Sequence, residues 1–104
     1  MKSLEVRVPH GLEKAEVRRR LDAAVERARR DYADKVSSLE AAWETEDRMA
    51  VDVVVLGMDL QSRIEVEVSQ LVIQLELPGM VTMFAGQIRS GIEERIGSLM
   101  GDPA

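Results

Sequence analysis

Apolar and polar residues alternate along residues 48–77, and this pattern predicts three consecutive β-strands. In the second and third strands the apolar residues fall at every other position: Leu60, Ile64, Val66 and Val68, then Leu71, Ile73, Leu75 and Leu77. In the first strand the residues that share one face are Met49, Val51, Val53 and Val55. A period of two is typical of a strand with one buried and one solvent-facing side. Together the buried sides form one dry face, which other elements must cover.

Shorter patterns flank this stretch. Two further strands are predicted, one over residues 3–8, which Pro9 ends, and one over residues 36–44. Two helices are predicted, over residues 12–32 and after Pro78, because apolar residues recur there at steps of three and four. The first helical stripe comprises Val17, Leu21, Ala24, Val25, Ala28 and Tyr32. The second comprises Val81, Phe84, Ile88, Ile92, Ile96 and Leu99.

The order of these elements is β-α-β-β-β-β-α. We interpret residues 1–104 as a single domain of the α+β class, since this length suits one modest core. The architecture expected is an antiparallel β-meander with both helices packed on its one dry face, a two-layer sandwich. The pattern leaves open whether the first strand pairs with the second or with the fifth.

The connections between the strands predict their register, because a slip of one residue would turn a whole strand inside out. Residues 57–58 and 69–70 are expected to form two-residue turns, the first with Gly57 in the position that a type II′ turn requires. Residues 44–48 form a longer polar loop. The residue pairs expected to lie opposite each other are Val55 with Leu60, Val68 with Leu71 and Trp43 with Met49.

The shared parity and the helical stripes predict the core. The residues expected to be largely buried are Trp43, Val53, Ile64, Val66, Ile73, Leu75, Phe84, Ile88 and Ile92. Replacing Ile64 or Phe84 by Ala should then lower the free energy of unfolding by about 2–5 kcal/mol.

Charge is distributed unevenly along the chain. Residues 1–35 hold ten Lys or Arg and seven acids, whereas residues 36–104 hold four and twelve, for a net charge of −5. This overall acidity argues against a nucleic-acid partner. The absence of cysteine excludes disulfides and thiolate metal sites and fits a cytoplasmic protein. The longest apolar run, residues 53–58, is too short to cross a bilayer.

The residues capable of chemistry do not form a recognisable constellation. His10 is the one histidine, and no second ligand stands at metal-binding spacing. We interpret it as a surface histidine whose replacement by Ala changes little. Glu65 and its neighbouring carboxylates fall on the wet sheet face, where such groups are usually solvated. No catalytic residue, metal site or cofactor is therefore predicted.

Three groups of residues are candidate partner surfaces. The basic side of the first helix, with Arg19, Arg27 and Arg30, suits an anionic surface, although nearby acids make a solvated face the simpler interpretation. The start of the last helix offers Met80 and Met83, since Met adapts to varied apolar partners. The wet sheet face carries three apolar residues: Val54, Leu56 and Val72. With an open edge strand, that face predicts a homodimer.

Short segments along nearly the whole chain resemble the polyhydroxyalkanoic acid system proteins, also called the polyhydroxyalkanoate granule region family. The N-terminal segments are Pro9-His10-Gly11-Leu12, Glu16-Val17-Arg18 and Trp43 before an acidic turn. The others are Gly57, Ile64-Glu65-Val66, Leu75-Glu76-Leu77, Ile88, Ile92-Glu93 and Ile96. The resemblance implies a small bacterial cytoplasmic protein linked with polyester storage granules, and it supplies no catalytic residue.

The sequence therefore favours a non-enzymatic accessory or binding protein associated with a polyester granule surface or a granule coat protein. The alternative is a small ligand-binding protein or enzyme with a pocket between helices and sheet, using His10 or Glu65. A deep cavity with a convergent polar group would favour this alternative, and a filled core would favour the accessory protein.

Overall fold

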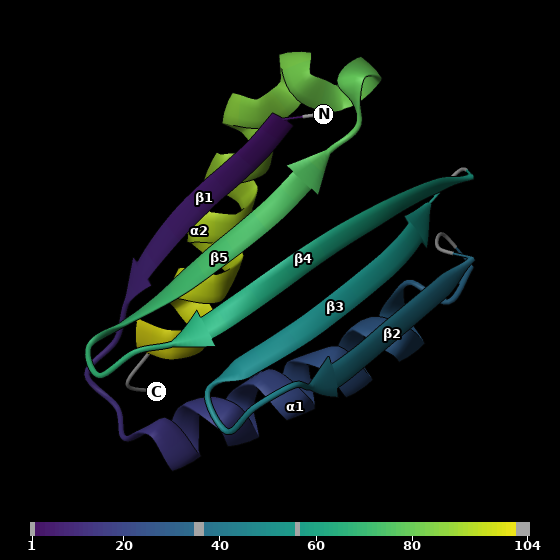
Figure 1. Cartoon of the computed structure of the whole chain (residues 1–104). Helices are drawn as coiled ribbons and strands as arrows, with labels where there is room; N and C mark the ends of the chain where they lie inside the picture. The colour runs from purple at the N-terminus through teal and green to yellow at the C-terminus, as the bar shows by residue number, and fades with distance from the viewer. Residues whose placement is uncertain (1, 35–36, 56, 102–104) are drawn as a thin grey trace.

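Five strands and two long helices make up the fold in a computed structural model that describes residues 2–34, 37–55 and 57–101 (Figure 1). In chain order the elements are β1 (Lys2–Pro9), α1 (Lys14–Asp31), β2 (Ser38–Trp43), β3 (Arg48–Val55), β4 (Met58–Val66), β5 (Gln70–Leu77), the 3₁₀ helix η1 (Gly79–Phe84) and α2 (Ala85–Gly101). The predicted α+β class and element order are confirmed. The helix predicted after Pro78 is divided into η1 and α2.

The strands form one antiparallel sheet in the order β1-β5-β4-β3-β2. β2 to β5 are a meander, and β1 adds to the far side of β5, with Val6 opposite Ile73. The open question about the first strand is thereby settled in favour of the fifth. β1 and β2 are the two edges, which places the first and second strands of the chain at opposite sides of the sheet.

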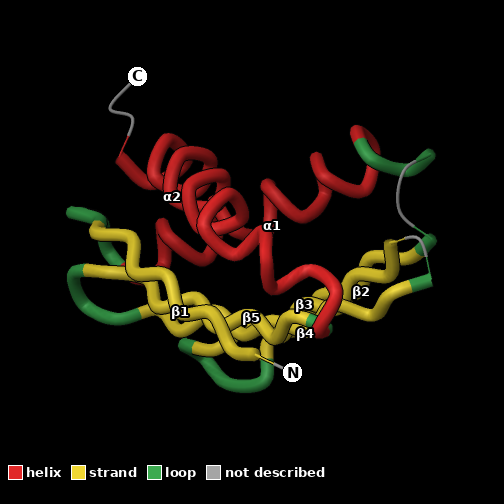
Figure 2. The backbone as a smooth tube through the Cα atoms, turned by 90° about the horizontal axis from the view of Figure 1, so that it is seen from above, coloured by secondary structure: helices red, strands yellow, loops and turns green. Residues whose placement is uncertain are grey.

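Both helices cover the same face of the sheet, as Figure 2 shows. α2 contacts β1, and α1 contacts β4. In Figure 1, α2 lies behind β1 and β5, and α1 lies behind β2 and β3. Trp43 on β2 donates a hydrogen bond from Nε1 to the Asp22 carboxylate on α1 at 2.9 Å. The Arg18 guanidinium stands 4.6 Å from the centre of the same indole ring. These contacts join α1 to the edge of the sheet.

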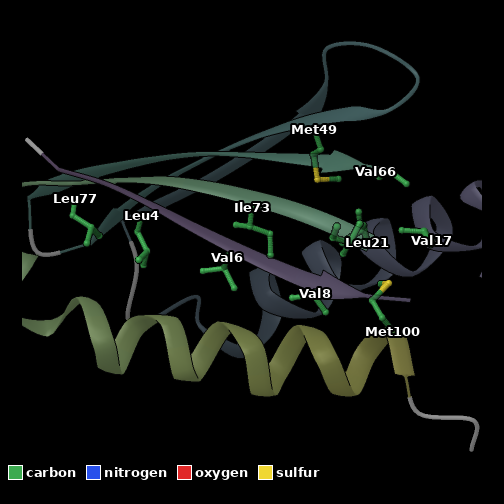
Figure 3. Packing of buried hydrophobic residues seen from close by; sticks show 11 residues of the cluster. Leu4, Val6, Val8, Val17, Leu21, Met49, Val66, Ile73, Leu77 and Met100 are labelled. Atoms are coloured by element: carbon green, nitrogen blue, oxygen red, sulfur yellow. The ribbon is translucent and has the colours of Figure 1, made fainter. Parts of the chain in front are cut away.

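The core lies between the sheet and the two helices (Figure 3). Residues of β1 alternate strictly, with Leu4, Val6 and Val8 buried and the residues between them exposed. The other buried apolar residues of this cluster are Val17, Leu21, Met49, Val66, Leu71, Ile73, Leu77 and Met100. The dry face predicted from the period of two is therefore the face that the helices cover.

The predicted core is confirmed only in part. Val66 and Ile73 are buried, whereas the half-buried members are Trp43, Val53, Ile64, Leu75, Ile88 and Ile92. Phe84 was wrongly placed in the core, since 47% of its surface is exposed. It ends η1, and the 3.0-residue turn of a 3₁₀ helix rotates it away from the face defined by the 3.6-residue turns of α2.

Two of the three predicted registers are displaced by two residues. Leu60 lies opposite Val53 instead of Val55, and Leu71 lies opposite Val66 instead of Val68. The Glu67 N–H donates to the Gln70 carbonyl oxygen at 2.9 Å, so the turn consists of residues 68–69. Val68 is consequently 80% exposed and not on the dry face.

The displacement leaves the faces unchanged. A shift of two residues preserves which side chains point inward, because side chains alternate with a period of two. Gly57 has a φ of 77°, a conformation that Gly adopts without a Cβ clash, and it occupies the second position of its turn rather than the first. The third predicted pair, Trp43 opposite Met49, is confirmed.

Candidate functional site

A groove of about 840 Å³ runs between α1 and α2 on the side of the helix layer that is open to solvent. Its walls come from residues 19–32 and 94–99, and no strand residue lines it. Arg20 closes one part of it by donating from Nη1 to the Leu99 carbonyl oxygen at 2.9 Å. Arg95 spans it from the other helix, donating to the Tyr32 hydroxyl at 2.6 Å. The groove is thus held by two arginine bonds between the helices.

Glu16 organises the arginines at one end of the groove. Its carboxylate accepts hydrogen bonds from Arg19 at 2.6 Å and from Arg20 at 2.7 Å. These bonds lower the pKa of Glu16 from 4.5 to about 2 and raise the pKa of Arg19. Arg20 is therefore fixed by Glu16 on its own helix and by Leu99 on the other.

The lowered pKa of Glu16 predicts a dependence of stability on pH. Because the pKa of Glu16 is lower in the folded protein than in the unfolded chain, its ionised carboxylate stabilises the fold at pH values above 4.5. This contribution to the free energy of unfolding is lost as the pH falls toward about 2. We expect the free energy of unfolding to fall less over this window in Glu16→Gln than in the parent, measured by urea denaturation. Glu13→Gln is the control, and equal slopes for all three proteins would contradict the role of Glu16.

The basic residues predicted as a partner surface separate into two sets. Arg19 and Arg27 line the groove, whereas Arg30 is exposed outside it. In the described part of the chain, Arg27 makes no ion pair or hydrogen bond. The sequence did not reveal Arg95 as a partner of these residues, because the crossing of α1 and α2 is a tertiary contact between residues far apart in the chain.

Exposed large apolar side chains lie at opposite ends of the molecule. Met83 is 80% exposed and adjoins the half-exposed Phe84 in η1. Val68 stands at the β4–β5 turn, at the other end of β5 (Figure 1). The side chain of Met80 lies outside the described residues. Met83 and Phe84 therefore form a candidate apolar surface for contact with a partner.

The outer sheet face is less apolar than the sequence suggested. Val72 is only 6% exposed, so the prediction that it adds apolar surface is wrong. Arg7 and Glu65 lie directly opposite it on β1 and β4 and flank it with long side chains. Val54 is half-buried, and Leu56 lies outside the described residues.

Two carboxylates on or beside this outer face have cationic partners. Arg48 binds Glu65 at 2.6 Å, and Arg63 binds Glu44 at 3.1 Å. Each partner comes from a neighbouring strand or loop, so the ion pairs link β4 to the β2–β3 hairpin. Glu65, the carboxylate considered for acid–base chemistry, is therefore engaged in a structural pair.

A family comparison matches residues 4–100 to the family described as "Putative polyhydroxyalkanoic acid system protein". The chain belongs to this family. The matched residues run from β1 to the end of α2, so family membership extends over the sheet, both helices and the groove. The resemblance drawn from short sequence segments is confirmed.

Other comparisons add little to the family assignment. No curated protein matches the chain. A crystal structure of Ara h 8.0201 aligns with a TM-score of 0.41 and 12% identity, covering 95% of this chain and 97% of that one. A crystal structure of TTHA0849 from Thermus thermophilus aligns with a TM-score of 0.34 and 13% identity, covering 94% and 91%. Both TM-scores are below 0.5, so neither structure carries an argument about this protein.

His10, in one of the segments that resemble this family, is buried rather than on the surface. It is 7% exposed, and its backbone N–H donates to the Ser69 carbonyl oxygen at 2.9 Å. The ring Nε2 lies 2.9 Å from the Glu67 carbonyl oxygen, and the Leu12 N–H donates to Nδ1 at 3.3 Å. Because a carbonyl only accepts, Nε2 carries the proton and Nδ1 is the acceptor. The histidine ties the end of β1 to the β4–β5 turn.

This network changes the prediction for His10→Ala. The substitution leaves the Glu67 carbonyl oxygen and the Leu12 N–H without their partner, which should lower the free energy of unfolding by about 1–3 kcal/mol. Urea denaturation measures the effect, with Gln74→Ala on the exposed face of β5 as the control. A loss within about 0.5 kcal/mol, the range of ordinary surface substitutions, would restore the surface interpretation.

The described residues contain no group of three or more His, Asp or Glu side chains placed to hold a metal ion. Among the described helices, none has the length and apolar content needed to cross a membrane.

The homodimer stays a prediction, and β2 is now the edge strand at which we expect the two copies to meet. On the β1 edge, Arg89 donates to the Glu5 carbonyl oxygen at 2.6 Å, and α2 packs beside it. β2 has one strand neighbour, β3, within the described sheet. We expect light scattering at micromolar concentration to give the mass of two chains. Ala42→Lys on β2 should lower this measured mass more than Val54→Lys on β3. A one-chain mass at every concentration and salt would contradict association.

Proposed function

We propose that the protein is a non-enzymatic accessory protein that binds the surface of polyhydroxyalkanoate storage granules in the bacterial cytoplasm. The observation that carries this proposal is family membership over residues 4–100. The family description refers to a polyhydroxyalkanoic acid system, and a polyhydroxyalkanoic acid is an aliphatic polyester of hydroxyalkanoic acids. A granule of this polyester presents an apolar surface with ester carbonyl groups.

The exposed apolar pair in η1 is the part of the molecule best suited to such a surface. Met83 and Phe84 are adjacent, and each leaves about half or more of its surface in water. Burying apolar area contributes about 25 cal/mol per Å², so two large side chains give a useful share of an adsorption energy. An unbranched Met side chain also adapts to an irregular polymer surface.

Non-enzymatic function is supported by the contacts of the two residues considered for chemistry. Both ring nitrogens of His10 are occupied by backbone groups, and Glu65 is paired with Arg48. The alternative function required a pocket between the helices and the sheet. The groove of about 840 Å³ instead lies between the helices themselves, and no strand residue lines it.

Binding to protein-free polymer particles tests the proposal. Purified protein is mixed with amorphous polyhydroxybutyrate particles and centrifuged, and the bound fraction is compared with that on polystyrene particles of equal size. We expect the parent protein to sediment with the polyester and Met83→Ser/Phe84→Ser to lose most of this binding. Val68→Ser is the matched control, because Val68 is equally exposed but lies at the opposite end of β5.

Three outcomes would each contradict a different element of the proposal. No binding to the polyester would remove the polymer surface as the partner. Equal binding to polystyrene would show adsorption without recognition of the polyester. Binding only after a granule coat protein is added would transfer the contact from the polymer to that coat protein.

A further inference from the structure

We infer that the groove between α1 and α2 binds the free carboxylate end of a short hydroxyalkanoate chain. The inference rests on the proposed function, because it assigns a polyester-derived ligand to a second surface of the same protein. It concerns the end of the chain, whereas the Met83–Phe84 pair concerns the bulk surface.

The size of the groove suits such a ligand. Small-molecule sites usually enclose about 300–1,000 Å³, and the groove has about 840 Å³. Its wall includes short or aliphatic side chains from both helices: Ala24, Ala28, Ile96 and Leu99. Ala side chains leave room beside the helix axis, so an aliphatic chain several units long fits along this wall.

The charge of the groove selects an anion. Four arginines and the carboxylates of Asp31 and Glu94 line it, and with Glu16 included the local charge is +1 in a chain whose net charge is −5. Arg19 and Arg20 are already bound to Glu16. Arg27 makes no ion pair or hydrogen bond in the described structure, and the Arg95 guanidinium donates to the Tyr32 hydroxyl rather than to a carboxylate. Neither Arg27 nor Arg95 is paired with a carboxylate in the described structure, so both have donors that a ligand carboxylate could bind.

The two features together define the ligand. A guanidinium presents donors in a planar fork that matches a carboxylate. The ester carbonyls of a hydroxyalkanoate chain are acceptors as well, so the remaining arginine donors have partners along the chain. An aliphatic body with one anionic end thus matches an apolar wall with two charge-bearing arginines, one from each helix.

Calorimetric titration with a synthetic 3-hydroxybutyrate tetramer tests the inference. We expect the tetramer with a free carboxylate to bind at least about tenfold more tightly than its methyl ester, because a hydrogen bond to a charged group contributes a tenfold factor or more. Arg27→Gln/Arg95→Gln should remove this preference. Arg29→Gln/Arg30→Gln is the matched control, with the same change of charge on α1 residues outside the groove.

A second variant tests the groove without changing its charge. Ala28→Phe places a ring in the apolar wall and should weaken binding of the tetramer by about tenfold or more, while far-ultraviolet circular dichroism and the unfolding midpoint report that the variant is folded. Equal affinity of acid and methyl ester, or unchanged binding by both groove variants, would overturn the inference.

Two further results separate this inference from the proposed function. Particle sedimentation without tetramer binding would overturn the groove site and leave granule binding intact. Tetramer binding without particle sedimentation would support the groove site and contradict granule binding. Binding to phosphatidylserine vesicles that exceeds binding to the tetramer and is lost in Arg27→Gln/Arg95→Gln would assign the groove to a lipid and overturn the inference.

Discussion

Leu71→Ala is expected to lower the free energy of unfolding by about 2–5 kcal/mol, whereas Phe84→Ala should change it by less than about 1 kcal/mol. Leu71 is fully buried on β5, an interior strand of the sheet, opposite Val8 on one side and Val66 on the other. Its truncation leaves a cavity among residues that cannot all move inward. Phe84 leaves nearly half of its surface in water, so its truncation removes few contacts.

Chemical denaturation of the two variants and of Leu71→Met measures this difference. Leu71→Met conserves volume and should cost less than about 1.5 kcal/mol, which separates loss of volume from any change at the position. A larger loss for Phe84→Ala than for Leu71→Ala would mean that the 3₁₀ geometry of η1 is wrong. It would also place Phe84 on the dry face, as the helical pattern had predicted.

Trp43→Ala is expected to destabilise the fold by about 2–4 kcal/mol, somewhat less than the loss of a fully buried Trp. The indole packs against the core, stacks with the Arg18 guanidinium and donates to Asp22. All three contacts link β2, at the sheet edge, to α1.

Trp43→Phe separates the contribution of ring packing from that of the hydrogen bond to Asp22, because it keeps an aromatic ring and removes the Nε1 donor. We expect it to cost about 1 kcal/mol, in line with the loss of one hydrogen bond. Circular dichroism follows unfolding in both variants, since the fluorescence of the single tryptophan is lost. Equal costs for Trp43→Ala and Trp43→Phe would show that ring packing contributes nothing.

The sequence predicted the sheet well because its signal is local. Alternation in residues 48–77 identifies the faces of three strands, and the observed pairs keep those faces even where the register differs by two residues. The alternation did not identify which residues form the β3–β4 and β4–β5 turns. A register displaced by two residues places the same side chains on the buried face. Burial alone therefore does not distinguish Val66 from Val68 as the partner of Leu71.

The groove was not predictable from the same patterns. The stripe of α1 reads as one apolar face, yet Val17 and Leu21 enter the core while Ala24 and Ala28 line the groove. Periodicity shows which side of a helix is apolar but not whether a sheet or another helix covers each turn. The position of His10 was missed for a similar reason, since its partners Glu67 and Ser69 are more than 50 residues away in sequence.

Fractionation of granule-forming bacterial cells tests whether the protein binds polyhydroxyalkanoate granules. Granules are isolated by density centrifugation from cells that make the chain with an affinity tag, and the tagged protein is quantified in the granule and soluble fractions. We expect the parent protein and Val68→Ser to be enriched on granules, and Met83→Ser/Phe84→Ser to be recovered in the soluble fraction. Recovery of the folded parent protein entirely in the soluble fraction, in cells that contain granules, would contradict it.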